Sequence, residues 1–376
     1  MDIDATLSTY LDAVWEQGAS DLLLVAGSAP LLRIDGFLRP MVGEPILEPD
    51  VIEKYVRSML RLEHREILER NRQVDFSFSW KDIGRFRGNA YRTKGTTAVA
   101  LRAIPDRIPQ LEELGAPQGA DILLRKPYGL VLAVGPTGSG KSTTLAGMVD
   151  RINSFRECHI LTIEDPVEYI HTHQRAAVSQ REVGEDVPSF AAGLRAALRE
   201  DPDVILVGEM RDTESISITL TLAETGHLVF GTLHTNDAAQ ALDRIVDVFP
   251  AERRDQIQIQ LAASLQGVIS QRLLPVTGGG RVAAFEVLIG TEAVRNLIRE
   301  GKTRQLRNVI TTSREAGMQT IENDLTRLVA TGMITRQAAE AVSAYPKEIL
   351  AQGPLPASQL AAMGIAASPY IPAQVH

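Results

Sequence analysis

The stretch GPTGSGKS, from Gly135 to Ser142, decides the fold of the larger part of this chain. It matches the Walker A pattern, in which a glycine-rich loop joins a strand to a helix. The apolar run at 130–134 predicts a buried parallel strand before it, and residues 142–150 predict the helix after it. Glycines allow backbone N–H groups to converge on phosphate oxygens, and the helix adds its positive N-terminal end. The stretch therefore predicts an α/β domain that binds a nucleotide.

The residues expected to bind the phosphates of ATP are the loop and its continuation: Gly135, Pro136, Thr137, Gly138, Ser139, Gly140, Lys141, Ser142 and Thr143. Lys141 is expected to reach the β and γ phosphates, and the Ser142 hydroxyl to hold Mg²⁺. The alternative, a glycine-rich turn that arose by chance, is disfavoured because both the motif and its strand and helix context are complete.

Length and charge narrow the class of protein. A chain of 376 residues is long enough for two domains. Its 39 Lys and Arg against 47 Asp and Glu give a net charge of −8, which counts against a nucleic acid as the main partner. Cys158 is the single cysteine, so a disulfide framework is excluded. The acidic N-terminus and the lack of a long apolar stretch predict a cytoplasmic protein that contacts a membrane only peripherally.

Periodicity divides the chain into an N-terminal α+β domain at 1–103, a linker at 104–120 and an ATPase domain at 121–345. The first domain is expected to hold helices at 4–16 and 50–71 and antiparallel strands at 74–80, 84–92 and 96–102. The ATPase domain is expected to alternate strands at 130–134, 160–163, 204–207 and 228–231 with helices at 189–198 and 213–224. Helices follow at 292–299, 303–310 and 321–330. Residues 346–376 form a tail, predicted to be disordered from about Gly353.

Acidic residues follow two of the predicted strands, where they can organise Mg²⁺ and a water molecule. Glu164 follows the strand at 160–163, and Glu209 comes just after the strand at 204–207. We assign Glu209 as the Walker B glutamate that organises water and metal, and Glu164 as a residue that helps to orient the attacking water. These two roles could be exchanged, and Mg²⁺ would be held by Ser142, Glu209 and Glu164, directly or through water. The structural alternative is that both are solvated acids at helix starts.

Histidines and arginines supply further candidates. His227 precedes the strand at 228–231 and His234 follows it, so His234 is expected on the side where strand ends form ligand crevices. A structural hydrogen-bonding role is the alternative for either histidine. The arginines of the N-terminal domain could neutralise phosphate charge in a neighbouring subunit, or could belong to a solvated sheet face: Arg85, Arg87, Arg92 and Arg102.

Four motifs in order, GPTGSGKST, TIEDPVEY, DPDVILVGEMRD and TGHLVFGTLHTN, resemble the Walker A, Asp box, Walker B and His box of the secretion ATPase superfamily. AVRNLIREGK, from Ala293 to Lys302, is similar to a signature of the PilT-like type IV pilus retraction ATPases. The resemblance implies a PAS-like N-terminal domain and a RecA-like ATPase domain. It also implies that His234 senses the γ phosphate.

The resemblance further implies a homohexameric, Mg²⁺-dependent ATPase at the inner face of the cytoplasmic membrane. Such a motor would power pilus disassembly and twitching motility by engaging an inner-membrane platform protein, and it could work with a paralogous pilus ATPase. The alternatives are a pilus assembly or type II secretion ATPase and an accessory PilU-like retraction ATPase. From other classes, a nucleic-acid translocase and an ATP-binding scaffold stay open.

Overall fold

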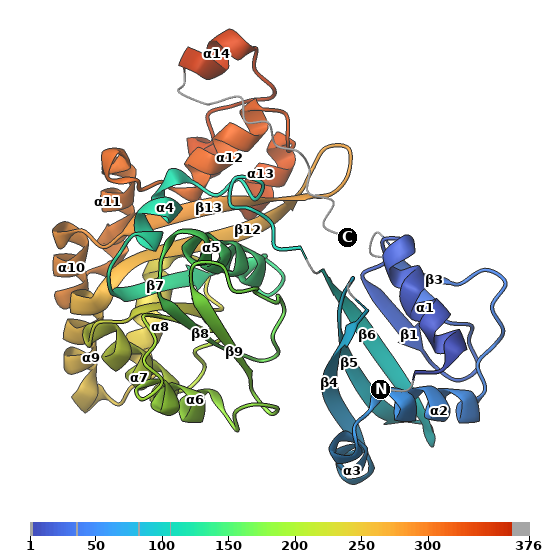
Figure 1. Ribbon diagram of the computed structural model, residues 1–376. Coiled ribbons are helices and arrows are strands. Elements are labelled where there is room, and N and C mark those ends of the chain that lie inside the picture. Colours follow the sequence, from blue (N-terminus) through green and yellow to red (C-terminus); the bar gives the residue numbers. More distant parts are fainter. Residues whose placement is uncertain (1–2, 35–36, 82, 106, 363–376) are drawn as a thin grey trace. The chain divides into compact units, whose positions relative to one another are not determined.

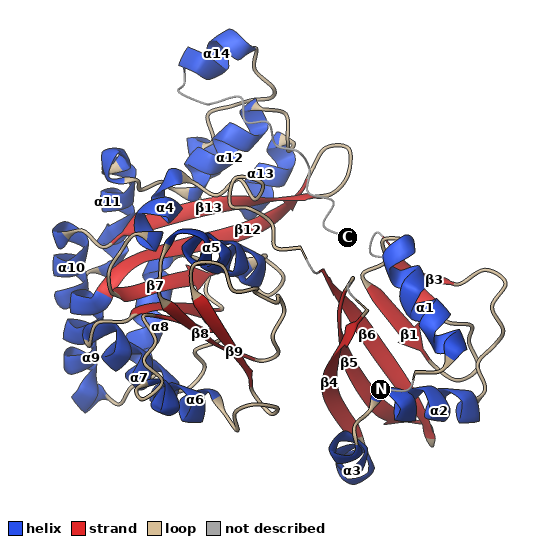
Figure 2. Cartoon of the chain, viewed as in Figure 1, coloured by secondary structure: helices blue, strands red, loops and turns tan. Residues whose placement is uncertain are grey.

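The computed structural model describes residues 3–34, 37–81, 83–105 and 107–362 (Figure 1). The chain folds into two compact units that divide between Arg107 and Ile108, inside the segment for which the sequence predicts a linker. Each unit has its own β-sheet and its own helices, as Figure 2 shows.

The N-terminal unit contains one antiparallel sheet in the order β3-β2-β1-β6-β5-β4. Its helices are α1 (Ala5–Glu16), α2 (Pro49–Met59) and α3 (Leu62–Asn71), and its strands are β1 (Asp21–Leu24), β2 (Leu31–Ile34), β3 (Phe37–Pro40), β4 (Gln73–Trp80), β5 (Gly84–Thr93) and β6 (Thr96–Pro105). The sequence prediction missed β1, β2 and β3, because four residues are too few for an alternating pattern to stand out.

Alternation of side chains along β4 gives this sheet a core face and a polar face. Val74, Phe76, Phe78 and Trp80 are buried, which confirms the strand predicted from their spacing. Helices α1 and α2 bury their apolar sides against the same core, for example through Leu11 of α1. The opposite face carries the polar side chains of β4 and β5.

The C-terminal unit is built around a seven-stranded sheet in the order β13-β12-β7-β11-β10-β8-β9. Its strands are β7 (Gly129–Val134), β8 (His159–Glu164), β9 (Ala177–Glu182), β10 (Val204–Val207), β11 (Leu228–Leu233), β12 (Leu265–Pro275) and β13 (Arg281–Ile289). Its longer helices are α4 (Gln118–Leu124), α5 (Lys141–Phe155), α6 (Phe190–Ala197), α7 (Thr213–Glu224), α8 (Ala238–Asp247), α9 (Ala251–Ser264), α10 (Glu292–Arg299), α11 (Leu306–Thr312), α12 (Ile321–Ala330) and α13 (Arg336–Val342).

Strands β7, β10 and β11 are buried along their whole length, as expected for parallel strands that are covered on both faces. The connection from β7 to β8 runs one way across the sheet, whereas the connections from β10 to β11 and on to β12 run the other way. Because such crossovers are right-handed, α5 lies on one face and α7, α8 and α9 lie on the other (Figure 1). Because β7, β11, β10 and β8 run parallel, their carboxyl ends meet at the same edge of the sheet.

The last part of the unit differs from the sequence prediction in two ways. Strands β12 and β13 form an antiparallel hairpin at the edge of the sheet, where the sequence prediction identified no strands. Residues 353–362 are not a disordered segment throughout, because helix α14 (Ala357–Ala362) forms there and Leu360 packs in a small apolar cluster with Leu325 and Ile349. An uncharged, apolar segment can gain stability by covering other apolar side chains. The rest of the predicted tail, 363–376, lies outside the described residues.

Candidate nucleotide-binding and catalytic site

The predicted phosphate loop connects β7 to α5, so that it stands at the carboxyl edge of the parallel sheet. Two of its glycines adopt left-handed backbone angles, with φ of 77° at Gly138 and 86° at Gly140. A side chain is disfavoured in this conformation, which explains why glycine is needed there. Gly140 also directly precedes the first turn of α5, whose free N–H groups and positive dipole end favour an anion.

The Lys141 side chain is buried in this loop, with only 7% of the residue exposed. Its Nζ donates hydrogen bonds to the carbonyl oxygens of Gly135, at 2.8 Å, and Pro136, at 3.1 Å. Burial lowers the pKa of Lys141, and the negative charges of Glu209 and Glu168 act in the opposite direction. The cation is thus held by backbone carbonyls, and a phosphate group in the loop would stabilise its charge.

His234 joins the phosphate loop to the acidic end of β10. Its Nδ1 lies 3.4 Å from the Thr137 hydroxyl, and its Nε2 lies 3.3 Å from a Glu209 oxygen. Arg211 forms an ion pair with the same carboxylate, at 2.5 Å. Burial acts to raise the pKa of Glu209, but Arg211 and His234 outweigh it and hold that pKa below its usual value. Glu209 is therefore a carboxylate at neutral pH, in contact with a histidine that also contacts the loop.

Glu164 ends β8 on the same edge of the sheet and has a different environment. The Thr162 hydroxyl donates to its Oε1 at 2.6 Å, and the Gln180 amide lies 3.3 Å from the same oxygen. Burial raises the pKa of Glu164 to about 7, although both hydrogen bonds favour the ionised form. A carboxyl group that titrates near neutral pH is suited to take up a proton from water.

Two hydroxyls open helix α5. Ser142 is exposed, whereas the Thr143 hydroxyl forms a 3.0 Å hydrogen bond with the Tyr169 hydroxyl. Within the described residues, no group of three or more His, Cys, Asp and Glu side chains is placed to hold a metal ion. Mg²⁺ commonly takes one or two protein oxygens and completes its shell with phosphate and water oxygens. The Ser142 hydroxyl and nearby strand-end carboxylates fit this requirement.

His227 is the predicted site residue that the structure separates from this group. It precedes β11, so it stands at the opposite end of the strand from His234. Its Nδ1 lies 2.9 Å from the Leu222 carbonyl oxygen, and its own carbonyl accepts a hydrogen bond from the N–H of Gly129. His227 thus connects the end of α7 to the start of β7, which matches the structural alternative for this histidine.

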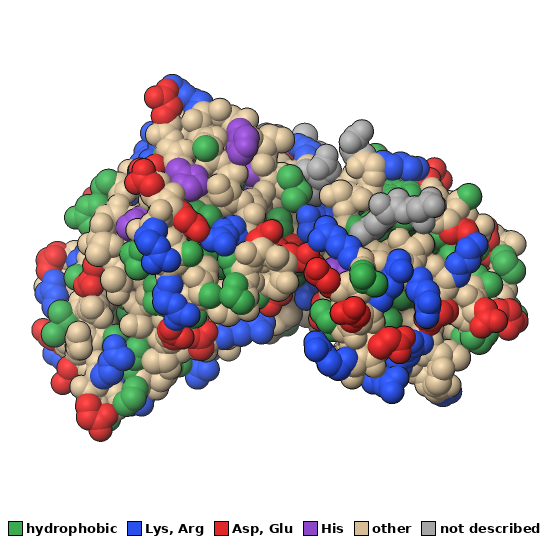
Figure 3. Space-filling view, turned by 60° about the horizontal axis from the view of Figure 1, so that its bottom comes forward, with side chains coloured by type: hydrophobic (Ala, Val, Ile, Leu, Met, Phe, Trp, Pro, Cys, Tyr) green, Lys and Arg blue, Asp and Glu red, His purple; other side chains and the backbone are tan. Residues whose placement is uncertain are grey.

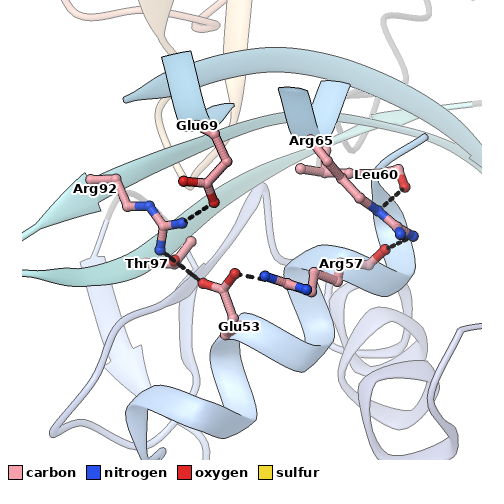
Figure 4. A network of polar contacts seen from close by, with 7 residues as sticks. All are labelled: Glu53, Arg57, Leu60, Arg65, Glu69, Arg92 and Thr97. Carbon is pink, nitrogen blue, oxygen red and sulfur yellow. Dashed lines mark hydrogen bonds and ion pairs between the residues drawn. The ribbon is translucent and has the colours of Figure 1, made fainter. Parts of the chain in front are cut away.

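The four candidate arginines lie on β5 and β6 of the N-terminal unit and have different partners. Arg92 points to the helix-covered side, where it pairs with Glu53, at 2.9 Å, and Glu69, at 2.5 Å, and contacts the Thr97 hydroxyl (Figure 4). Arg102 forms a 2.9 Å ion pair with Asp21, Arg85 bonds to the Ser77 hydroxyl, and Arg87 is exposed.

Several residues that shape the site were not identified from the sequence. Arg211 lies in the Walker B motif, two residues after Glu209. This close spacing could have predicted the ion pair between them. Gln180 lies on β9 and approaches Glu164 because β9 pairs with β8, and Tyr169 approaches Thr143 through the loop between these strands. Gln271 of β12 bonds to the phosphate loop from 132 residues away, and the sequence contains no local signal for that contact.

The parallel sheet, the phosphate loop on its carboxyl edge and the paired strand-end acids define the chain as a P-loop nucleotide hydrolase. The chain belongs to the Type II/IV secretion system protein family, whose model matches residues 3–343. It is 48% identical over 332 residues to the Type IV pilus retractation ATPase PilT of Pseudomonas aeruginosa, covering 88% of this chain and 96% of that protein.

A second relative is the Type IV pilus ATPase PilU of the same organism, which is 41% identical over 86% of this chain and 85% of its own length. Among solved structures, the crystal structure of the pilus retraction motor PilT with bound ADP superposes with a TM-score of 0.85. It shares 49% sequence identity and covers 91% of this chain and 98% of that chain. These matches confirm the α/β fold class, with a P-loop ATPase domain and an N-terminal domain, and the predicted resemblance.

Proposed function

We propose that the chain is the ATPase motor that retracts type IV pili, and that it drives twitching motility by hydrolysing ATP. The observation that carries this proposal is the high identity to a pilus retraction ATPase along nearly the full length of both proteins. The site supports it chemically, because loop, lysine, two carboxylates and histidine meet at one edge of the sheet.

Phosphate binding is the first task of the site. Backbone N–H groups of the loop and the start of α5 bind the phosphate oxygens, and Lys141 donates to the β and γ phosphates. Ser142 and Glu209 would hold Mg²⁺, directly or through water, and Glu164 would contact it through a bound water. When it is bound, Mg²⁺ supplies positive charge to the phosphate oxygens.

Hydrolysis requires an attacking water and a way to remove its proton. Glu164 is the better general base, because its raised pKa of about 7 lets it accept a proton at neutral pH. Glu209 stays ionised and orients water and metal, which is the role that its place in the Walker B motif predicts. His234 contacts both Glu209 and Thr137, so it can report whether the γ phosphate is present.

A homohexamer would complete the site with arginines from a neighbouring subunit. Arg87 and Arg85 share one face of β5 and are the best candidates to act on phosphate charge in this way. Arg92 is better explained as a structural residue, because two carboxylates already neutralise it. Arg102 remains a candidate, because an exposed ion pair such as that with Asp21 is weak and can exchange partners.

The proposed partners are an inner-membrane pilus platform protein and, as an option, a paralogous pilus ATPase. None of the helices in the described part of the chain is long and apolar enough to cross a bilayer. The protein would then reach the inner face of the cytoplasmic membrane by binding these partners.

Deleting the gene tests the direction of the motor. Retraction predicts that surface pili persist or accumulate and that twitching stops, and a gene copy that carries Lys141→Ala should fail to restore twitching. Loss of surface pili would instead identify an assembly or secretion ATPase. Full twitching in the deletion strain, with retraction slowed only under load, would identify an accessory PilU-like ATPase.

Assays of ATP hydrolysis by the purified protein test two functions from other classes. A nucleic-acid translocase would show ATP hydrolysis stimulated by DNA or RNA with strong salt dependence. The interspersed acidic and basic side chains on the face drawn in Figure 3 give little support to that function. A scaffold that only binds ATP would release no phosphate at steady state.

A further inference from the structure

Strand β12 contacts two loops of the nucleotide site through three consecutive residues, Ser270, Gln271 and Arg272. Successive side chains of a strand point to opposite faces, so Gln271 faces one way and its two neighbours face the other. Gln271 is 3% exposed and contacts the phosphate loop. Ser270 and Arg272 both contact Asn236, in the loop that carries His234.

The Gln271 amide spans the turn between the phosphate loop and α5. Its Nε2 donates to the Ser139 carbonyl at 2.7 Å, and its Oε1 accepts from the Thr144 hydroxyl at 2.8 Å. Gly140, with its left-handed φ of 86°, lies between these two contacts. A Cβ atom at Gly140 would stand 2.8 Å from the Gln271 Nε2, so the amide closes tightly over this glycine.

The other face of β12 holds the loop after β11. The Ser270 hydroxyl donates to the Asn236 carbonyl at 3.1 Å, and Arg272 Nη2 donates to the same carbonyl and to the Asn236 side-chain oxygen, both at 3.1 Å. Asn236 is two residues from His234, which contacts both Thr137 and Glu209. The position of that histidine thus depends on a loop that β12 holds in place.

We propose that Ser270, Gln271 and Arg272 are positioning residues of the hydrolysis site, with separate tasks on the two faces of β12. Gln271 keeps the phosphate loop in the conformation that binds the nucleotide. Ser270 and Arg272 keep the His234 loop in register with Glu209. This inference rests on the nucleotide hydrolysis proposed above, and it adds residues that lie outside the four family motifs.

Gln271→Met tests the first task, because methionine has a similar volume and neither donates nor accepts a comparable hydrogen bond. Loss of both bonds leaves the buried Ser139 carbonyl without its donor and frees the turn at Gly140. We expect ADP to bind the full-length variant roughly tenfold more weakly, measured by calorimetry. The matched control is Gln319→Met, where the amide also donates to a backbone carbonyl, that of Phe285 in β13. The control should bind ADP like the parent.

Thr144 supplies an independent check that does not alter Gln271. Thr144→Val removes the hydroxyl and should weaken ADP binding, whereas Thr144→Ser keeps the hydroxyl and should stay closer to the parent. Because both residues act in one network, Gln271→Met combined with Thr144→Val should bind ADP about as weakly as Gln271→Met alone. Equal affinity of Gln271→Met and Gln319→Met, or fully additive effects of the two changes, would overturn the assignment of Gln271.

Arg272→Met tests the second task. We expect kcat per assembled molecule to fall about tenfold while the Kd for ADP stays within about twofold of the parent. Light scattering would establish that parent and variant have the same oligomeric state. An unchanged kcat, or a loss of ADP affinity like that of Gln271→Met, would refute the division of tasks. A parent that binds no ADP would overturn the proposed function as well, whereas a binding parent confines any failure to this inference.

Discussion

Charged side chains are treated differently in the two units of this protein. In the N-terminal unit, Arg92 forms ion pairs with the carboxylates of Glu53 and Glu69 and a hydrogen bond with the Thr97 hydroxyl. In the nucleotide site, Lys141 is held by two backbone carbonyls. Glu164 is held by the Thr162 hydroxyl and the Gln180 amide.

This difference separates Arg92, whose charge is neutralised within the fold, from Lys141 and Glu164. Glu209 is intermediate, because it is paired with Arg211 and contacts His234 while it also faces the phosphate loop through that histidine. An ion pair satisfies both partners and leaves little reason to bind anything else. A charge that is held by neutral groups is oriented and partly desolvated, and its interaction with a ligand of opposite sign is correspondingly stronger. Partial desolvation lowers the pKa of Lys141 and raises the pKa of Glu164, as expected for charges that are held by neutral groups.

Replacing Lys141 by Ala should have the largest effect. The loop would lose its only lysine donor to the phosphates, and we expect steady-state phosphate release to fall by at least about 100-fold. The thermal unfolding profile should remain close to that of the parent, because the lost contacts are two bonds to backbone carbonyls. Hydrolysis at the parent rate by a folded variant would remove Lys141 from the mechanism.

Glu164→Gln should follow, with a loss of kcat on the order of 100-fold, because an amide cannot accept the proton of water. The parent should also gain activity as pH rises through about 7, where Glu164 loses its proton. The variant should lack that rise. A pH profile that is unchanged by the substitution would mean that another group supplies the base.

The same carboxyl group affects stability in a direction that can be checked. Its pKa in the folded state is raised, so the folded protein holds a proton that the unfolded chain has released between about 4.5 and 7. The free energy of unfolding should therefore decrease as pH rises through this window, and Glu164→Gln should remove part of that decrease. Chemical denaturation at several pH values measures it, and a parallel pH dependence in both proteins would contradict the assignment.

Arg92→Met tests the structural side of the comparison. It leaves half-buried Glu53 with fewer partners, and we expect the N-terminal unit to lose about 2 kcal/mol of stability. Burial acts to raise the pKa of Glu53, but Thr97, Arg57 and Arg92 outweigh it and lower that pKa. The difference between variant and parent should therefore narrow as pH falls below 4.5, where Glu53 takes up a proton. A stable variant with impaired hydrolysis would instead place Arg92 among the functional arginines.

Arg102→Met should have the smallest effect on stability. Its ion pair with Asp21 is exposed on the arginine side, and such pairs contribute about 0.5 kcal/mol or less. Thermal unfolding should hardly change. If hydrolysis by the assembled protein nevertheless falls, the role of Arg102 lies at a neighbouring subunit and not in the fold.

The sequence was most informative where a few adjacent residues carry both structure and chemistry. Gly135 to Ser142 predicted the loop, the strand before it and the helix after it, and all three are present. The acids at the end of β8 and just after β10 were found for the same reason, because a strand end is visible in the sequence. Strands β1, β2 and β3 and the β12–β13 hairpin were missed. Their pairing with distant parts of the chain, such as that of β12 with β7, is not visible in the local sequence.

Residue types and local order thus determined which groups are available to this protein: a phosphate loop, two strand-end carboxylates and two histidines. Only the tertiary structure decided how they are used. It placed His234 against Thr137, 97 residues earlier in the chain, and left His227 at the other end of β11. It also brought Gln271 to the phosphate loop and gave Arg92 its carboxylate partners. The physical reason is that hydrogen bonds and desolvation depend on distance in space, which the order of residues specifies only through the complete fold.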